Sequence, residues 1–520
     1  MGALWSLSLG EMIDGLEAGA FTSRALVTAH LDRIHQLDGR LHAFTTVFDE
    51  DALRAAEGLD AERAAGTSRG PLHGVPISVK ECFDLAGHPT TLGLRSRQHT
   101  SAARDAAMVT LLREMGAVIL GRTNLSQTML FAESRNPLFG QTANPWSLAH
   151  SAGGSSGGEA AAVAAGMSPF GVGSDIGGSV RSPAAVCGVC ALKPTLDLLP
   201  IRGLQGVLRG QEAVRSMIGT FARSVDDLAR FYAALPRARM AALDPRVPPI
   251  PWEDPMDTDL RAIRVGWYTD DGVLPVSAGV RRAVHRATDV LVAQGIKVVP
   301  FTPPDVPAIL ADYLGALSSD GGVTLRAALG GDPPDPTLAP MLALAKLPDG
   351  GRRTLARAAS LVGQSRLGRM LDAMGEKPVA DLWRITDRLR AWRFAVLDAM
   401  DTAGIDAILC PAFATPALPH GMSKNFTLAS STAITWNAAQ FPAGVVPVSR
   451  VRADETARPR SMDGVERHAA KVDAASRGLP LSVQVVGRPW REPLVLAVMA
   501  AIEAGVRGDV DFPATPVEPR

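Results

Sequence analysis

The pattern of hydrophobic and polar positions alternates between helix and strand periods over the first third of the chain. Apolar residues recur at helical spacing over residues 8–37, with Thr22 as a candidate N-cap inside this stretch. The short apolar run 75–79 predicts a buried strand, and residues 105–115 and 117–120 predict a helix followed by another strand. This alternation favours an open sheet covered by helices on both faces.

The same alternation returns towards the C-terminal end. A helix ending at Met400 is followed by the predicted strand 407–409, which the breaker Pro411 closes. A final strand over 481–486 precedes a helix over 493–503. The predicted fold class is therefore α/β.

Two stretches interrupt this pattern. Residues 245–257 are rich in proline and acidic residues, which is typical of a connection on the surface. Residues 450–477 are charged and have few aliphatic clusters, so we expect an exposed insertion between two strands. Neither stretch separates two cores, and we expect one domain over residues 1–520.

Composition narrows the possible partners and the cellular compartment of the protein. The 520 residues include 53 basic and 53 acidic side chains without a basic run, so charge gives no reason to expect a nucleic-acid partner. Four cysteines are too few for a disulfide framework, and free thiols suit a reducing cytoplasm. No apolar stretch approaches the roughly 20 residues of a membrane span, and residues 1–14 lack the basic start of a signal peptide. We expect a cytoplasmic protein.

Candidate chemistry concentrates between residues 151 and 195. Two glycine-rich turns, 153–158 and 173–179, each deliver serines. Glycine permits backbone conformations that other residues resist, so such turns can aim several N–H groups at a developing oxyanion.

Other interpretations of these turns fit less well. A phosphate cradle would need a following Gly-Lys-Ser/Thr, and Gly171-x-Gly173 lacks the third glycine of a dinucleotide site. The Gly-x-Ser-x-Gly elbow of an α/β-hydrolase is absent around Ser179.

Three segments carry a resemblance to the amidase signature family. Residues 74–80, 153–156 and 177–183, with Leu192-Lys193-Pro194-Thr195 closing the last, resemble its motifs in order. The resemblance implies the fold of that family, a large mixed twisted sheet sandwiched between helices. It also implies a signature core over about residues 70–200.

The resemblance is closest to the fatty acid amide hydrolase branch of the family. The segments that carry it are 80–83, 136–141, 144–146, 247–249, 319–322 and 441–448. We expect no counterpart of the membrane-spanning segment that precedes the mammalian enzyme. The resemblance thus extends over nearly the whole chain.

This resemblance implies a Ser–cis-Ser–Lys triad without metal or cofactor. Ser179 would be the acylating nucleophile and Lys80 the base. Ser155, in a cis peptide bond, would be the bridging residue between them. A lysine base must be neutral when it accepts a proton, so we expect burial to lower its pKa. None of the 10 histidines lies in the glycine-rich core, and the nearest, His150, is interpreted as a loop residue.

An oxyanion hole should form from the backbone N–H groups of Ile176, Gly177, Gly178 and Ser179. Ser156 is expected to support the network.

Three further groups of residues have expected roles. Asp175 and Arg181 flank the loop and are interpreted as ions that shape it. Met129 lies in the stretch that the resemblance places at the acyl pocket, where methionine would adapt to the substrate. Cys187 and Cys190 lack a second Cys/His pair for zinc and are interpreted as core residues.

The expected activity is hydrolysis of N-acyl amides, including fatty acid amides, to an acid and an amine or ammonia. A glutaminase of the glutamyl-tRNA amidotransferase A type and an aryl or cyclic amide hydrolase stay open as alternatives. An inert scaffold is disfavoured because the matched lysine and both serines are intact.

Two expectations concern what the surface of the protein contacts, a membrane or a second copy of the chain. Residues 351–374 interleave five arginines with aliphatic residues, which fits either a helix pair on an anionic membrane or a solvated pair packed on the body. A homodimer is also open.

Overall fold

An 11-stranded mixed sheet organises the computed structural model, which describes residues 3–520. Met1 and Gly2, the start of the stretch expected not to be a signal peptide, lie outside the described residues. In spatial order the strands are β1 (Phe44–Val47), β3 (Val118–Thr123), β2 (Pro76–Lys80), β8 (Phe170–Asp175), β10 (Met217–Ala222), β9 (Cys190–Lys193), β14 (Ala443–Arg450), β15 (Pro480–Gly487), β13 (Ala407–Pro411), β11 (Arg264–Trp267) and β12 (Lys297–Pro300).

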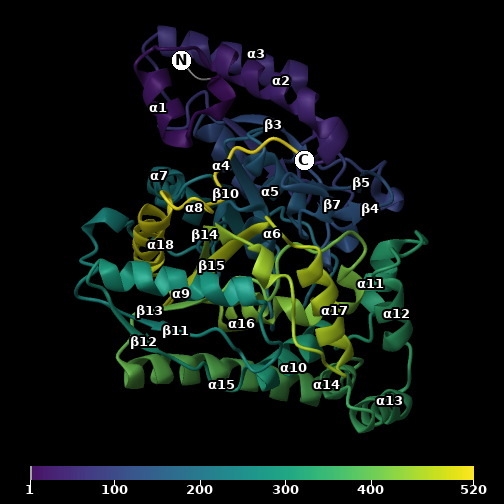
Figure 1. The fold of residues 1–520 in the computed structure, drawn as a ribbon. Helices are drawn as coiled ribbons and strands as arrows, with labels where there is room; N and C mark the ends of the chain where they lie inside the picture. Colours follow the sequence, from purple (N-terminus) through teal and green to yellow (C-terminus); the bar gives the residue numbers. More distant parts are fainter. Residues whose placement is uncertain (1–2) are drawn as a thin grey trace.

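Helices cover this sheet on both sides, with α9 and α18 on one face and α10, α15 and α16 on the other, while α1 to α3 pack at the N-terminal edge (Figure 1). The helices are α1 (Leu9–Glu17), α2 (Ser23–Leu41), α3 (Asp49–Ala64), α4 (Ala107–Glu114), α5 (Gly157–Ala164), α6 (Arg181–Cys187), α7 (Val225–Ala234), α8 (Arg237–Leu243), α9 (Ala278–Ala293), α10 (Val306–Leu317), α11 (Val323–Leu329), α12 (Ala339–Ala345), α13 (Asp349–Leu361), α14 (Ser365–Ala373), α15 (Val379–Ala403), α16 (Ser431–Ala439), α17 (Gly464–Ala474) and α18 (Glu492–Val506).

Strand β13 illustrates why both faces must be covered. Successive side chains of a strand point to opposite faces. Ala407 and Leu409 join one apolar cluster, whereas Ile408 and Cys410 join the other. The prediction of a sheet with helices on both faces is confirmed.

Element predictions agree with the structure to within a few residues. Thr22 caps α2, because its hydroxyl accepts from the Ala25 N–H at 3.1 Å. The stretch 8–37 contains two helices, α1 and α2, and Gly19 adopts a φ of +68° between them. A positive φ suits glycine and ends the first helix there.

The segment 450–477 joins the antiparallel neighbours β14 and β15 and is less exposed than its charge suggests. It contains α17, whose Val472 and Asp473 are buried. Arg458 donates to the Asp473 carboxylate at 2.8 Å, so the segment is anchored by a buried ion pair. The segment 245–257 is mostly exposed and is held by the buried Val247 and Pro255.

Helices α13 and α14 form the segment 351–374 and pack against each other. Arg352 is buried against Asp349, and Arg366 donates to Glu466, so two of the five arginines serve the fold. Leu361 at the turn between the helices is 87% exposed. No helix in the described part of the chain is both long and apolar enough to span a membrane. Contact of this segment with a membrane surface stays a prediction.

Candidate active site

The site begins where strand β2 ends, at Lys80. This strand is paired on both sides, with β3 and β8, and Lys80 is fully buried. Its Nζ donates to Ser155 Oγ at 2.8 Å and to Ser174 Oγ at 3.0 Å. Burial lowers the pKa of Lys80 to about 8, because the charged ammonium loses its hydration.

The first glycine-rich turn delivers Ser155 to this lysine. The peptide bond between Gly154 and Ser155 is cis, and Gly153 has a φ of +82°. A Cβ on Gly154 would lie 2.6 Å from the Glu133 nitrogen, so only glycine fits there. Ser156 connects the two turns, because its N–H donates to the Ser179 carbonyl at 3.1 Å.

The second glycine-rich turn runs between β8 and α6 and carries Ser179. Ser179 is half-buried, whereas Ser155 is almost fully buried. The Gly178 N–H donates to Asp175 Oδ1 at 2.8 Å. Within residues 3–520 the N–H groups of Gly177 and Ser179 donate to no other protein group. Gly178 therefore already serves the loop scaffold, and the other amides of the predicted oxyanion hole are the ones left for a ligand.

A buried ion pair holds this turn in shape. Arg181 Nη2 and Asp175 Oδ1 are 3.0 Å apart, and both side chains are inaccessible. Burial alone would raise the pKa of Asp175, but Arg181, together with Lys193 and Asn437, outweighs that effect and holds it well below its usual range. Arg181 also donates to Gln484 of β15 and to Asn437 of α16. The sequence analysis did not identify Gln484 or Asn437. The available signal was Gln484 itself, a polar residue in the otherwise apolar strand 481–486.

Glu159 is another buried group that sequence reasoning missed. It lies in α5, and its carboxylate accepts from the Ser78 hydroxyl at 2.6 Å and the Thr123 hydroxyl at 2.7 Å. A Cβ on Gly171 would overlap this carboxylate, so glycine makes the room for it. Burial raises the pKa of Glu159 to about 8.

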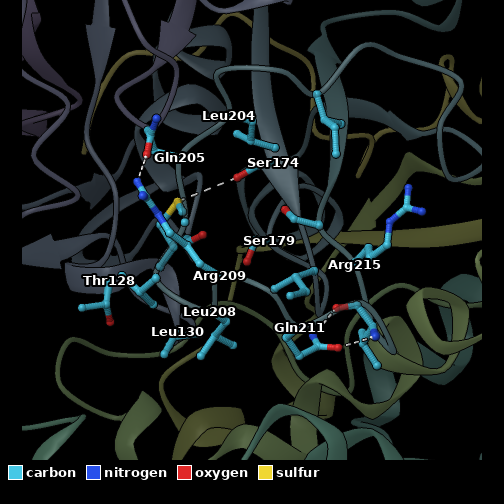
Figure 2. Close-up of a pocket in the computed structure, with 18 of the residues that line it drawn as sticks. Thr128, Leu130, Ser174, Ser179, Leu204, Gln205, Leu208, Arg209, Gln211 and Arg215 are labelled. Carbon is cyan, nitrogen blue, oxygen red and sulfur yellow. Dashed lines mark hydrogen bonds between the residues drawn. The ribbon is translucent and has the colours of Figure 1, made fainter. Parts of the chain in front are cut away.

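Two cavities meet at Ser179 and share Met129, Leu130, Ile176 and Leu208 in their walls. The larger, of about 410 Å³, we call the arginine cavity (Figure 2); its polar wall includes Gln205, Arg209, Gln211, Glu212, Arg215 and Arg246. The smaller, of about 150 Å³, we call the apolar cavity; its wall includes Tyr313, Leu314, Leu317, Leu325, Met341, Leu342, Met374 and Ile434.

The remaining candidates lie away from these cavities. The interpretation of His150 as a loop residue was wrong: it lies in β7 (Ser147–Ser151), which pairs with β6 (Ala143–Asn144), and Ser147 Oγ is 2.8 Å from its Nδ1. Cys187 and Cys190 are buried. Residues 3–520 contain no cluster of three or more His, Cys, Asp or Glu side chains suited to a metal.

Comparison with known proteins agrees with this architecture. The amidase family model matches residues 25–496. Fatty-acid amide hydrolase 1 of Sus scrofa is 35% identical over 96% of this chain and 86% of its own length. The A-type chain of the glutamyl-tRNA(Gln) amidotransferase of Acidothermus cellulolyticus is 38% identical, over 59% of this chain and 60% of its own. A solved fatty acid amide hydrolase structure matches with a TM-score of 0.84 and 28% identity, over 98% of this chain and 86% of that one. The chain therefore belongs to the amidase family and is a hydrolase that acts on amide C–N bonds.

Proposed function

We propose that this amidase cleaves N-acyl amides with apolar acyl chains through an acyl-enzyme on Ser179, with Ser155 and Lys80 completing a Ser–cis-Ser–Lys triad. The observation that carries the proposal is the buried hydrogen bond between Lys80 Nζ and Ser155 Oγ, 2.8 Å long, beside the junction of two cavities at Ser179. A serine hydroxyl is a poor nucleophile and needs such a base.

The proton relay follows from the donors and acceptors present. Neutral Lys80 can donate an N–H to Ser174 Oγ and accept the Ser155 proton with its lone pair. Ser155 in turn takes the Ser179 proton as Ser179 attacks the amide carbonyl. The oxyanion is bound by the amides of Ile176, Gly177 and Ser179, and the proton then returns through Ser155 to the leaving amine. Water hydrolyses the acyl-enzyme by the same relay in reverse.

The apolar cavity supports an aliphatic acyl chain as its occupant. Its wall contains several leucines and three methionines, Met129, Met341 and Met374, whose flexible side chains adapt to chains of different length. Burial of a methylene is favourable by about 0.8 kcal/mol. The Sus scrofa relative, over 96% of this chain, is a fatty-acid amide hydrolase by name.

The amidotransferase alternative has weaker support. Its relative matches 59% of this chain, against 96% for the fatty-acid amide hydrolase of Sus scrofa. An aryl or cyclic amide would react with the same nucleophile but would place a different group in the two cavities. A hydrolysis screen separates the three classes: fatty acyl amides of increasing length, anilides, and free glutamine with ammonia as the readout.

The nucleophile is tested by Ser179→Ala, with Ser216→Ala as its control. Ser216 lines the arginine cavity but is no part of the relay. We expect Ser179→Ala to lose amide hydrolysis and labelling by a fluorophosphonate probe while its melting temperature stays close to that of the parent. Ser216→Ala should keep the fluorophosphonate labelling. Labelling retained in Ser179→Ala would contradict the assignment.

A further inference from the structure

The two cavities that meet at Ser179 differ in their chemistry. The apolar cavity suits the acyl half of an amide, which leaves the arginine cavity (Figure 2) for the amine half. The wall of the arginine cavity contains three arginines and one acid, Glu212. The amine half thus meets an excess of positive charge.

Two of these arginines are already paired. Arg215 forms an ion pair with Asp197, and Glu212 lies 3.4 Å from its Nε. Arg246 reaches the same Glu212 at 3.5 Å. Their charge is therefore largely balanced within the protein.

Arg209 is different. In the described part of the chain no carboxylate lies within 4.0 Å of its guanidinium, which donates to the Gln205 side chain at 2.7 Å. Gln205 is itself fixed, because its amide nitrogen donates to Asp84 at 2.7 Å. One hydrogen bond to a fixed partner leaves most of the five guanidinium donors of Arg209 available to a ligand.

A second cation, Arg97, lies close enough to Arg209 for the two charges to interact. Burial and then the charge of Arg209 lower the pKa of Arg97, which is half-buried and forms no ion pair within residues 3–520. The charges of Glu81 and Asp84 oppose this effect at Arg97, so Arg209 is the cation of the cavity wall that an anion would complete.

From this arrangement we infer that the preferred substrates are acyl amides whose amine half carries a carboxylate, as in an N-acyl amino acid, with Arg209 binding that carboxylate. The planar guanidinium fork matches a carboxylate with two hydrogen bonds. This inference rests on the proposed function, because it takes Ser179 as the point where the acyl and amine halves separate.

The test compares two amides that share one acyl chain, N-dodecanoylglycine and the neutral N-dodecanoylethanolamine. We expect the parent enzyme to have the higher kcat/KM for the glycine conjugate. Arg209→Gln should lower kcat/KM for this conjugate about tenfold, mainly through KM, and affect the ethanolamide much less. Arg209→Lys should restore part of the loss, since it keeps the charge without the fork.

Arg202→Gln is the matched control, because Arg202 is an exposed arginine of the same segment that lies outside the arginine cavity. Arg202→Gln should leave kcat/KM unchanged for both substrates. Equal or faster cleavage of the ethanolamide by the parent, or an equal loss on both substrates in Arg209→Gln, would overturn the inference and leave the proposed function standing. Failure of the parent to cleave either amide would instead overturn both.

Discussion

Placing a carboxylate beside Lys80 tests whether burial sets the activity of this enzyme at neutral pH. With a pKa of about 8, about 9% of Lys80 is neutral at pH 7. With its ordinary pKa of 10.5 the neutral share would be about 0.03%, so burial increases the active form about 300-fold, equivalent to about 3 kcal/mol. A base works only when neutral, so kcat/KM should rise with pH and level off above pH 8.

Ser174 is the position for this perturbation, since its hydroxyl lies 3.0 Å from Lys80 Nζ. Ser174→Asp puts a negative charge there, whereas Ser174→Asn has nearly the same size and no charge. An opposite charge at this distance favours the ammonium and raises its pKa by about 1–3 units. At pH 7 we expect Ser174→Asp to have about 10- to 1,000-fold lower kcat/KM than Ser174→Asn.

The assay is the pH profile of kcat/KM on a fluorogenic acyl amide between pH 6 and 10.5, which reports groups of the free enzyme. The midpoint of the rise should lie at higher pH in Ser174→Asp, and the two variants should converge at the alkaline end. Equal midpoints in the two variants, or a parent profile that is flat from pH 6 to 9, would refute the assignment of Lys80 as the base.

Two predictions concern the surrounding scaffold. Gly178→Ala would put a Cβ 2.6 Å from that of Ala433 at a φ of +107°, so we expect kcat on the same amide to fall at least about 100-fold. Gly39→Ala, in α2 with open space around it, should stay within about twofold of the parent. An active Gly178→Ala would contradict this reasoning. Between pH 4.5 and about 8 the Glu159 carboxyl of the folded protein holds a proton that the unfolded chain has lost. The free energy of unfolding of the parent should therefore fall as the pH rises, by about 1.4 kcal/mol per pH unit relative to that of Glu159→Gln. Thermal melts at several pH values measure this slope, and parallel melting temperatures for the two proteins would exclude it.

The order of elements along the chain was readable because it depends on local pattern. The apolar run at 75–79 became β2, displaced by one residue, and Thr22 caps α2 as its side chain allows. Spacing also indicated helices on both faces of the sheet. The strand order, in which β10 lies between β8 and β9, was not readable, because pairing joins segments far apart in sequence.

The charged segment 450–477 shows where pattern misleads. Its composition predicts exposure, yet Asp473 is buried because Arg458 of the same segment neutralises it. A charged residue can be buried when a partner is present, and composition does not reveal which charges are paired.

The sequence by itself indicated the candidate residues for the chemistry, Lys80, Ser155 and Ser179, because the motifs that resemble the family and their order are written in the chain. Only the tertiary structure decided their surroundings. It buries Lys80, which lowers its pKa, and it commits the Gly178 amide to Asp175. It also joins Arg181 to Gln484, 303 residues away, and brings an apolar and an arginine-lined cavity together at Ser179. The physical reason is that pKa, hydrogen bonding and cavity shape depend on neighbours in space, and the fold brings those neighbours from distant parts of the chain.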